Sequence, residues 1–296
     1  MGPLLFILYI NDIVNYSDIL KFILFADDTN VFHSHKQMSE LVKSVNYELE
    51  KLSEWFRSNK LSLNVQKTNY IIFTNKKIPE DDQLTLDGRK LERVVSTKFL
   101  GVVIDERLNW AEHVNYISIK ISKSLGVLGR VKHILSSSSL LMLYHTMIFP
   151  YLNYCNIIWG CAKPTVINKL TVLQKRAVRL VTRSSYRTST GPLFSKLRLL
   201  KLVDIHKLQT VLFMFKFKQH LLPVSCMHYF TVNTNRSYVT RNTSYFNLLK
   251  FRTCIRERCI TIRGPKLWHS LPESLQLSIN FRSIKSWLIR DVLESY

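Results

Sequence analysis

Asp27 and Asp28 form an acidic pair between two apolar runs of strand-forming residues, one ending at Phe25 and the other at Phe32. Turns between strands are normally built from Gly, Pro, Asn and other polar residues, whereas here the turn is acidic. Two uncompensated carboxylates at a hairpin tip repel each other, and a bound cation relieves that repulsion. Their oxygen atoms suit Mg²⁺ or Mn²⁺. The pair therefore indicates a metal site, and the competing interpretation is a solvated Asp-Asp turn.

The sequence on both sides of the acidic pair resembles a known family. Residues 2–13, GPLLFILYINDI, are typical of a helix with Pro3 in its first turn, where a missing N–H costs nothing. Together with FADD at 25–28, this segment resembles the reverse transcriptases of LINE-type (non-LTR) retrotransposons. Further motifs follow in that family's order over essentially the whole chain: LSLNVQKT at 61–68, TKFLGVVID at 97–105, YLNYC at 151–155, GPKLW at 264–268 and LPE at 271–273.

The resemblance implies an RNA-directed DNA polymerase that adds nucleotides to a primer 3′-hydroxyl with the help of two Mg²⁺ ions. Its partners would be an RNA template, a DNA primer and dNTPs. On the family pattern Asp27 bridges the two ions, while Asp28 contributes more weakly and often without touching them. Phe25 occupies the position of the family's tyrosine. The sequence offers no replacement for the second bridging carboxylate, because Asp12 matches the structural acid of the helix end and Asp18 lies in a loop.

That second carboxylate belongs, in the family, to a strand upstream of the helix that starts at Gly2, and the chain begins within that helix motif. The fingers that grip the nucleotide are missing from the sequence as well. We therefore expect a polymerase-like fold that does not polymerise by itself. The alternative is a non-catalytic, nucleic-acid-binding remnant of a truncated element.

Two further segments match family motifs with chemical roles. Lys67 matches a lysine near the triphosphate that could protonate the departing pyrophosphate, and an exposed lysine beside a strand explains it equally well. The segment around Gly101 matches the primer-grip hairpin. There a glycine lets the backbone approach the primer phosphates, and Lys98 could pair with one of them. The competing interpretation is an ordinary turn glycine.

The net charge of +21 over 296 residues is unevenly distributed. Residues 1–110 carry 14 Lys and Arg against 15 Asp and Glu, whereas residues 111–296 carry 28 against 6. Such one-sided charge usually serves a polyanionic partner, although a merely soluble cationic surface is the alternative. The asymmetry predicts a boundary near residue 110. We expect the C-terminal part of a palm at 1–110, a basic helical thumb at 111–220 and a basic C-terminal region at 221–296.

The segment 164–183 has the spacing of a basic amphipathic helix. Such a helix can bind a membrane surface, but beside a polymerase-like palm a nucleic-acid groove is favoured. The expected nucleic-acid contacts on it are Lys175, Arg176, Arg179 and Arg183. A second set of candidates consists of aromatic side chains between 223 and 261 that could stack on bases or serve the core instead: Tyr229, Phe230, Tyr238, Tyr245 and Phe246.

The hydrophobic pattern predicts an α+β fold, in which a partial palm, an antiparallel sheet with helices on one face, precedes a mainly helical thumb and C-terminal region. An amphipathic helix should run from 38 to 56, and a type I′ hairpin should turn at Asp87-Gly88. Further helices are expected at 111–134, 138–150, 164–183 and 203–219, and near the end of the chain.

Other classes of protein are disfavoured. No apolar run reaches the roughly 20 residues of a membrane span, and the N-terminus lacks the features of a secretory signal. The five cysteines form neither a disulfide framework nor a zinc-ligand pattern. An intracellular protein is expected, with nucleus and cytoplasm both open.

Overall fold

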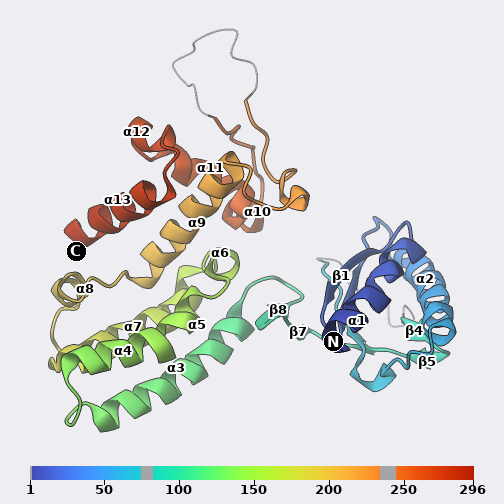
Figure 1. Ribbon diagram of the computed structural model, residues 1–296, viewed down its shortest axis with the longest axis horizontal. Helices are drawn as coiled ribbons and strands as arrows, with labels where there is room; N and C mark the ends of the chain where they lie inside the picture. The colour runs from blue at the N-terminus through green and yellow to red at the C-terminus, as the bar shows by residue number, and fades with distance from the viewer. Residues whose placement is uncertain (1, 75–82, 234–244) are drawn as a thin grey trace. The chain divides into compact units, whose positions relative to one another are not determined.

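The computed structural model of this protein describes residues 2–74, 83–233 and 245–296 (Figure 1). The chain forms two compact units. The first contains residues 1–97 and 105–108, and the second contains residues 98–104 and 109–296. The boundary expected near residue 110 lies close to this division, and it stays a prediction, as does the boundary at 220.

The first unit is built around helix α2, whose apolar face forms the centre of a small core. Leu49, Leu52, Trp55 and Phe56 recur at helical spacing on that face and are buried, with Ile13 packed in the same core. The elements up to α2 are α1 (Gly2–Ile10), the 3-10 turn η1 (Asn11–Tyr16), β1 (Lys21–Phe25), β2 (Asp28–Phe32) and α2 (Met38–Ser58).

The later elements of this part of the chain are short: η2 (Val65–Lys67), β3 (Asn69–Tyr70), β4 (Thr85–Leu86), β5 (Arg89–Lys90), β6 (Glu92–Arg93), β7 (Ser96–Phe99) and β8 (Val102–Asp105). Among the described residues the strands form separate pairs, β1–β2, β3–β6, β4–β5 and β7–β8, and β3–β6 is parallel. The expected α+β class is confirmed, but these strands do not join into one antiparallel sheet, since most are too short to pair on both sides.

The turn between β4 and β5 has the expected type I′ character. Asp87 has a φ of 51° and Gly88 a φ of 70°, both in the left-handed region that this turn requires. The Asp87 carboxylate accepts hydrogen bonds from Ser53 and Arg57 of α2, so the turn is tied to the core helix. These donors, with the Ser53 hydroxyl first, lower the pKa of Asp87.

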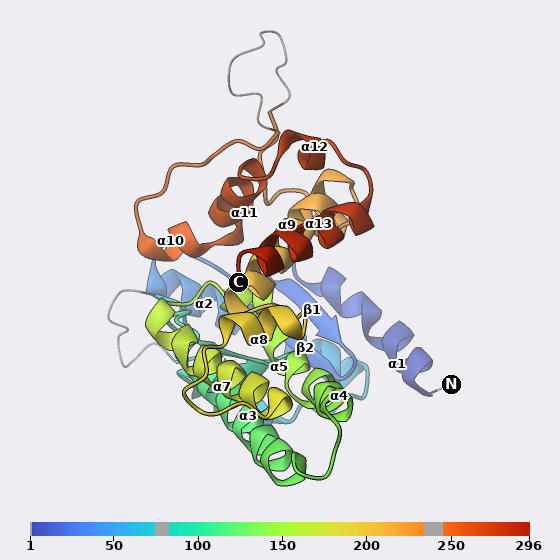
Figure 2. The same cartoon turned by 90° about the vertical axis from the view of Figure 1, so that its left-hand side faces the viewer.

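The second unit begins with a helical layer around its own core. Its helices are α3 (Ala111–Val131), α4 (Ser137–Met147), α5 (Phe149–Asn153), α6 (Asn156–Trp159), α7 (Pro164–Thr182) and α8 (Gly191–Lys196). Helices α3 and α7 lie side by side (Figures 1 and 2). They run parallel, because Lys169 near the start of α7 donates to Asn115 near the start of α3 (2.9 Å), while Arg183 at the end of α7 donates to the Leu135 carbonyl just beyond α3.

A second layer packs on α9 and has a separate aromatic-rich core. Helices α11 and α13 both contact α9 (Figure 2). Gly264 allows the close approach of α11, because an added Cβ would collide with Met214 of α9. The elements are α9 (Leu202–Lys218), η3 (Val224–Cys226), α10 (Cys254–Arg258), α11 (Ile260–His269), α12 (Glu273–Gln276) and α13 (Phe281–Glu294).

This core also decides between the two interpretations of the aromatic residues between 223 and 261. Phe230 and Phe246 are buried against Phe217, so of the two interpretations the core role holds for them and base stacking does not. Their size makes them core residues of a unit that must bury apolar surface between irregular segments. Tyr229 is 48% exposed, Tyr245 is half-buried in the same cluster, and Tyr238 lies outside the described residues.

No helix in the described parts of the chain has both the length and the apolar character needed to cross a lipid bilayer.

Two buried histidines of the second unit predict a pH-dependent stability. His113 accepts the Val103 N–H at Nδ1 (3.2 Å), and His206 Nδ1 lies 3.1 Å from the Asn156 carbonyl oxygen. Burial lowers the pKa of each ring to about 4. An unfolded chain titrates its histidines near 6.5, so between about pH 6.5 and 4 the unfolded state binds more protons. Stability therefore falls as the pH drops through that window.

At pH 5 the expected loss is about 2 kcal/mol per histidine relative to pH 8. Chemical unfolding at the two pH values measures it. His113→Gln and His206→Gln cannot titrate and keep a polar side chain at the hydrogen-bonded position, so each should shrink the difference between the two pH values. The exposed His133→Gln should leave it unchanged. Equal pH dependence in all four proteins would contradict the role of the buried rings.

Candidate functional site

The acidic pair lies at the tip of the β1–β2 hairpin. These strands pair antiparallel with Phe25 opposite Asp28, so Ala26 and Asp27 make the two-residue turn. Ala26 has a φ of 51°, a left-handed conformation that non-glycine residues rarely adopt. Such strained positions cluster at functional sites. Asp27 and Asp28 are both exposed, and within the described residues neither carboxylate has a hydrogen-bond or ion-pair partner.

The carboxylates of this pair suit one hard cation but do not complete a two-ion centre. Mg²⁺ takes six oxygen ligands, and two adjacent carboxylates can supply some of them with water completing the set. No group of three or more His, Cys, Asp or Glu side chains that could hold a metal ion occurs in the parts of the chain that are described. A metal ion at the hairpin tip stays a prediction.

The surface around the hairpin is apolar to an unusual degree. Phe25, beside the acidic pair, is 60% exposed, and Leu4, Leu5 and Leu8 of α1 are exposed to a similar extent. Single exposed apolar residues are common, but several on one helix and the neighbouring strands indicate an interaction surface.

Lys67 lies in η2. The Asn64 side chain caps the start of η2 by accepting the Lys67 backbone N–H (3.2 Å). The lysine side chain is exposed. Among the described residues no hydrogen bond or ion pair joins it to Asp27 or Asp28, and its catalytic role stays a prediction.

The predicted primer-grip turn is anchored by Tyr154, in the segment 151–155. Leu100 and Gly101 have φ values of 44° and 84°, and the Tyr154 hydroxyl donates to the Leu100 carbonyl (2.7 Å). A Cβ on Gly101 would lie 3.3 Å from the Tyr154 ring. Gly101 is thus required both by its backbone conformation and by the close approach of Tyr154. Sequence reasoning found both motifs but not this contact, which spans 54 residues.

Lys98 extends from the same hairpin over an aromatic ring of α3. Its Nζ lies 5.5 Å from the centroid of Tyr116, and Lys120 Nζ lies 5.6 Å from the same ring. Both distances are within the range of a cation–π interaction. Lys98 is exposed, and its pairing with a primer phosphate stays a prediction.

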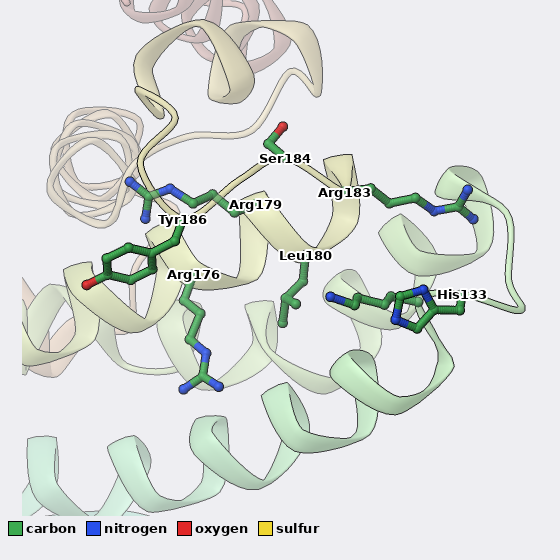
Figure 3. A pocket seen from close by; sticks show the side chains of 8 residues that line it. His133, Arg176, Arg179, Leu180, Arg183, Ser184 and Tyr186 are labelled. Carbon is green, nitrogen blue, oxygen red and sulfur yellow. The ribbon is translucent and has the colours of Figure 1, made fainter.

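A basic hollow of about 290 Å³ lies where α3 and α7 end (Figure 3). Three of the predicted nucleic-acid contacts line it, namely Arg176, Arg179 and Arg183, whereas Lys175 is half-buried and outside the lining. Sequence reasoning missed two lining residues, Lys132 and Tyr186. The remaining lining residues are His133, Leu180 and Ser184.

Comparison with known proteins places the hairpin within a recognised domain. Residues 1–104 match the family described as reverse transcriptase (RNA-dependent DNA polymerase). The chain is also similar to curated retrotransposon proteins over about two thirds of its length, which extends past that match into the helical second unit.

One such relative is the probable RNA-directed DNA polymerase from transposon X-element of Drosophila melanogaster, 26% identical over 212 residues, or 69% of this chain and 23% of the relative. Another, from transposon BS of the same species, is 27% identical over 200 residues, covering 63% and 22%. The RNA-directed DNA polymerase from mobile element jockey of Drosophila funebris is 24% identical over 215 residues, covering 69% and 23%. The chain thus spans about a quarter of the length of these relatives. No solved structure matches it.

Proposed function

We propose that this chain is the C-terminal palm segment and the thumb of a retrotransposon RNA-directed DNA polymerase, which extends a DNA primer on an RNA template with dNTPs. The observation that carries the proposal is the hairpin tip at Asp27 and Asp28, which presents two exposed carboxylates on a strained turn. The tip lies within the part of the chain that matches reverse transcriptases.

Each residue of the site has a defined role in this proposal. Asp27 coordinates Mg²⁺ or Mn²⁺ directly, and Asp28 strengthens the negative potential at the tip. Bound Mg²⁺ would activate the primer 3′-hydroxyl and neutralise the triphosphate. Lys67 protonates the leaving pyrophosphate. Gly101, held by Tyr154, brings the backbone to the primer, and Lys98 pairs with a primer phosphate.

Residues 1–296 by themselves are proposed to be inactive as a polymerase. A pair of catalytic ions would need carboxylates beyond this pair, and the described residues group no third acid with it. The exposed apolar surface of α1 and of the strands next to it is proposed to be covered by further polymerase segments in the working protein.

The proposed metal site predicts weak binding of a single ion. Titration of Mg²⁺ or Mn²⁺, followed by NMR or calorimetry, should give an affinity in the millimolar range, because only two carboxylates contribute. Asp27→Ala should weaken it further. Asp18→Ala, which removes an exposed acid elsewhere in the same unit, should have no effect. Tight binding of two ions by this chain would contradict the proposal that the acidic pair is an incomplete metal site.

A second candidate function is nucleic-acid binding without catalysis. Residues 111–296 carry 28 basic residues against 6 acidic ones, which favours this function. The hollow lined by Arg176, Arg179 and Arg183 supports it as well. Both candidate functions share this binding surface. They differ only in whether the acidic pair at the hairpin tip takes part in catalysis. Primer extension by a longer chain that also supplies the preceding part of the palm therefore separates them.

A further inference from the structure

Tyr186 stands out among the side chains that line the basic hollow. It is 85% exposed, yet its ring is held in place, since the Arg179 guanidinium lies 5.6 Å from the ring centroid. Arg179 is itself fixed by donating from Nε to the Thr188 carbonyl (3.0 Å). The result is an aromatic face presented to solvent at the edge of a cationic hollow (Figure 3).

The cations of the hollow have a structural explanation that must be considered first. Two parallel helices, α3 and α7, end here, and each helix C-terminus carries about half a negative charge. Positive side chains stabilise such ends. The two helix ends together account for about one charge, whereas the hollow is lined by Lys132 and three arginines and by no acid.

The individual partners divide these cations into two groups. Arg179 is bound to the Thr188 carbonyl, and Arg183 points away from Tyr186 and donates to the Leu135 carbonyl (Figure 3). These two arginines help to hold the helix ends and the following turns together. Arg176 and Lys132 have no hydrogen-bond or ion-pair partner within the described residues. Two cations that line the same hollow as the exposed ring are therefore free to meet a ligand.

The ligand that matches this arrangement is an anion joined to a flat ring. Guanidinium and ammonium groups bind phosphate, and an exposed tyrosine stacks on a nucleobase. A duplex keeps its bases stacked inside the helix and cannot offer one to Tyr186, whereas an unpaired nucleotide can. The small size of the hollow also suits part of one nucleotide better than a helix of paired strands.

We propose that this hollow binds one unpaired nucleotide of single-stranded nucleic acid, with its phosphate between Arg176 and Lys132 and its base stacked on Tyr186. The proposal rests on the nucleic-acid-binding function proposed above and adds a preference for single strands at this point of the thumb. It assigns to Tyr186 a direct contact with the ligand.

Fluorescence anisotropy with the 296-residue chain tests this assignment. The probes are a labelled 12-nucleotide oligothymidine and a blunt 12-base-pair duplex, both at low salt. Tyr186→Ala should weaken binding of the single strand by roughly 5- to 150-fold and change duplex binding less than about twofold. Tyr186→Phe retains the ring and should bind nearly as the wild type does. Tyr47→Ala, which removes an exposed ring of α2 in the first unit, should have no effect.

The outcomes separate this proposal from the one on which it rests. If the wild type binds but Tyr186→Ala leaves single-strand binding unchanged, or weakens both probes equally, the nucleotide site is wrong and nucleic-acid binding stands. If the wild type binds neither probe at low salt, nucleic-acid binding itself is contradicted. Arg176→Gln with Lys132→Gln should also weaken single-strand binding, and oligothymidine crosslinked through 5-iodouridine should label Tyr186.

Discussion

Asp27→Asn is expected to lower primer extension at least about 1,000-fold in a longer chain that also supplies the preceding part of the palm. The substitution keeps the size of the side chain and removes the charge that holds the metal ion. Stabilisation of the transferring phosphoryl group by the ions is worth several kcal/mol, and about 4 kcal/mol corresponds to this factor. Extension of a labelled DNA primer on an RNA template measures it.

The controls for this experiment come from the same unit. Asp28→Asn should reduce extension less than Asp27→Asn does, because Asp28 is proposed to act through the local potential rather than as a direct ligand. Asp18→Asn, just before β1 and at the end of the hairpin opposite the acidic tip, should extend normally. Residues 1–296 alone should show no template-dependent extension. Activity in that chain would contradict the proposal that its acidic pair needs a further carboxylate. Full activity of Asp27→Asn in the longer chain would show that Asp27 is not part of the catalytic site.

The elements that the sequence predicted well are those with a local physical cause. The spacing of apolar residues predicts α2, α3, α7 and α9 with their ends within about three residues of the observed ones. The Asp87-Gly88 turn was predicted because type I′ geometry demands two residues that tolerate positive φ. The hairpin at Asp27 was predicted from two apolar runs around an acidic turn, and the strands pair as expected.

Features that depend on distant packing were not predictable in this way. Lys132 and Arg176 are far apart in sequence, and only the parallel arrangement of α3 and α7 brings them to one hollow. The contact of Tyr154 with the Leu100 carbonyl likewise joins two segments that no periodicity relates. A hydrophobic pattern reports which face of an element is buried but not which other element covers it.

The aromatic residues show the same limit of prediction from sequence. Phe230 and Phe246 lie in a polar, irregular stretch that suggested exposed stacking residues, and both are buried. Tyr186 follows α7 in a turn that no sequence pattern marks as functional, yet it is the exposed ring of the basic hollow. Exposure is a property of tertiary packing, and composition alone does not decide it.

The basic face of α7 predicts a strong salt dependence of nucleic-acid binding. Each phosphate neutralised by Lys or Arg releases condensed counterions, so log K falls by about 0.7 to 0.9 per contact for each decade of salt. Replacing Lys175, Arg176, Arg179 and Arg183 together by Gln should therefore flatten the slope by about three. Between 50 mM and 500 mM salt the wild type should lose roughly 1,000-fold more affinity than this variant. All sequences should be affected alike, because phosphates carry no base identity.

The structure indicates how much each of the four residues should contribute to the salt dependence. Arg179 and Arg183 also hold backbone carbonyls, so the matched control exchanges the three arginines for lysine and leaves Lys175 in place. That variant keeps every charge while losing the guanidinium hydrogen bonds, and it should retain the wild-type slope. Lys175→Gln alone should change the slope less than Arg176→Gln, because Lys175 lies outside the hollow and Arg176 is exposed within it. An unchanged slope in the fourfold variant would move the phosphate contacts to another surface, and the basic residues between 236 and 263 would be the next to test.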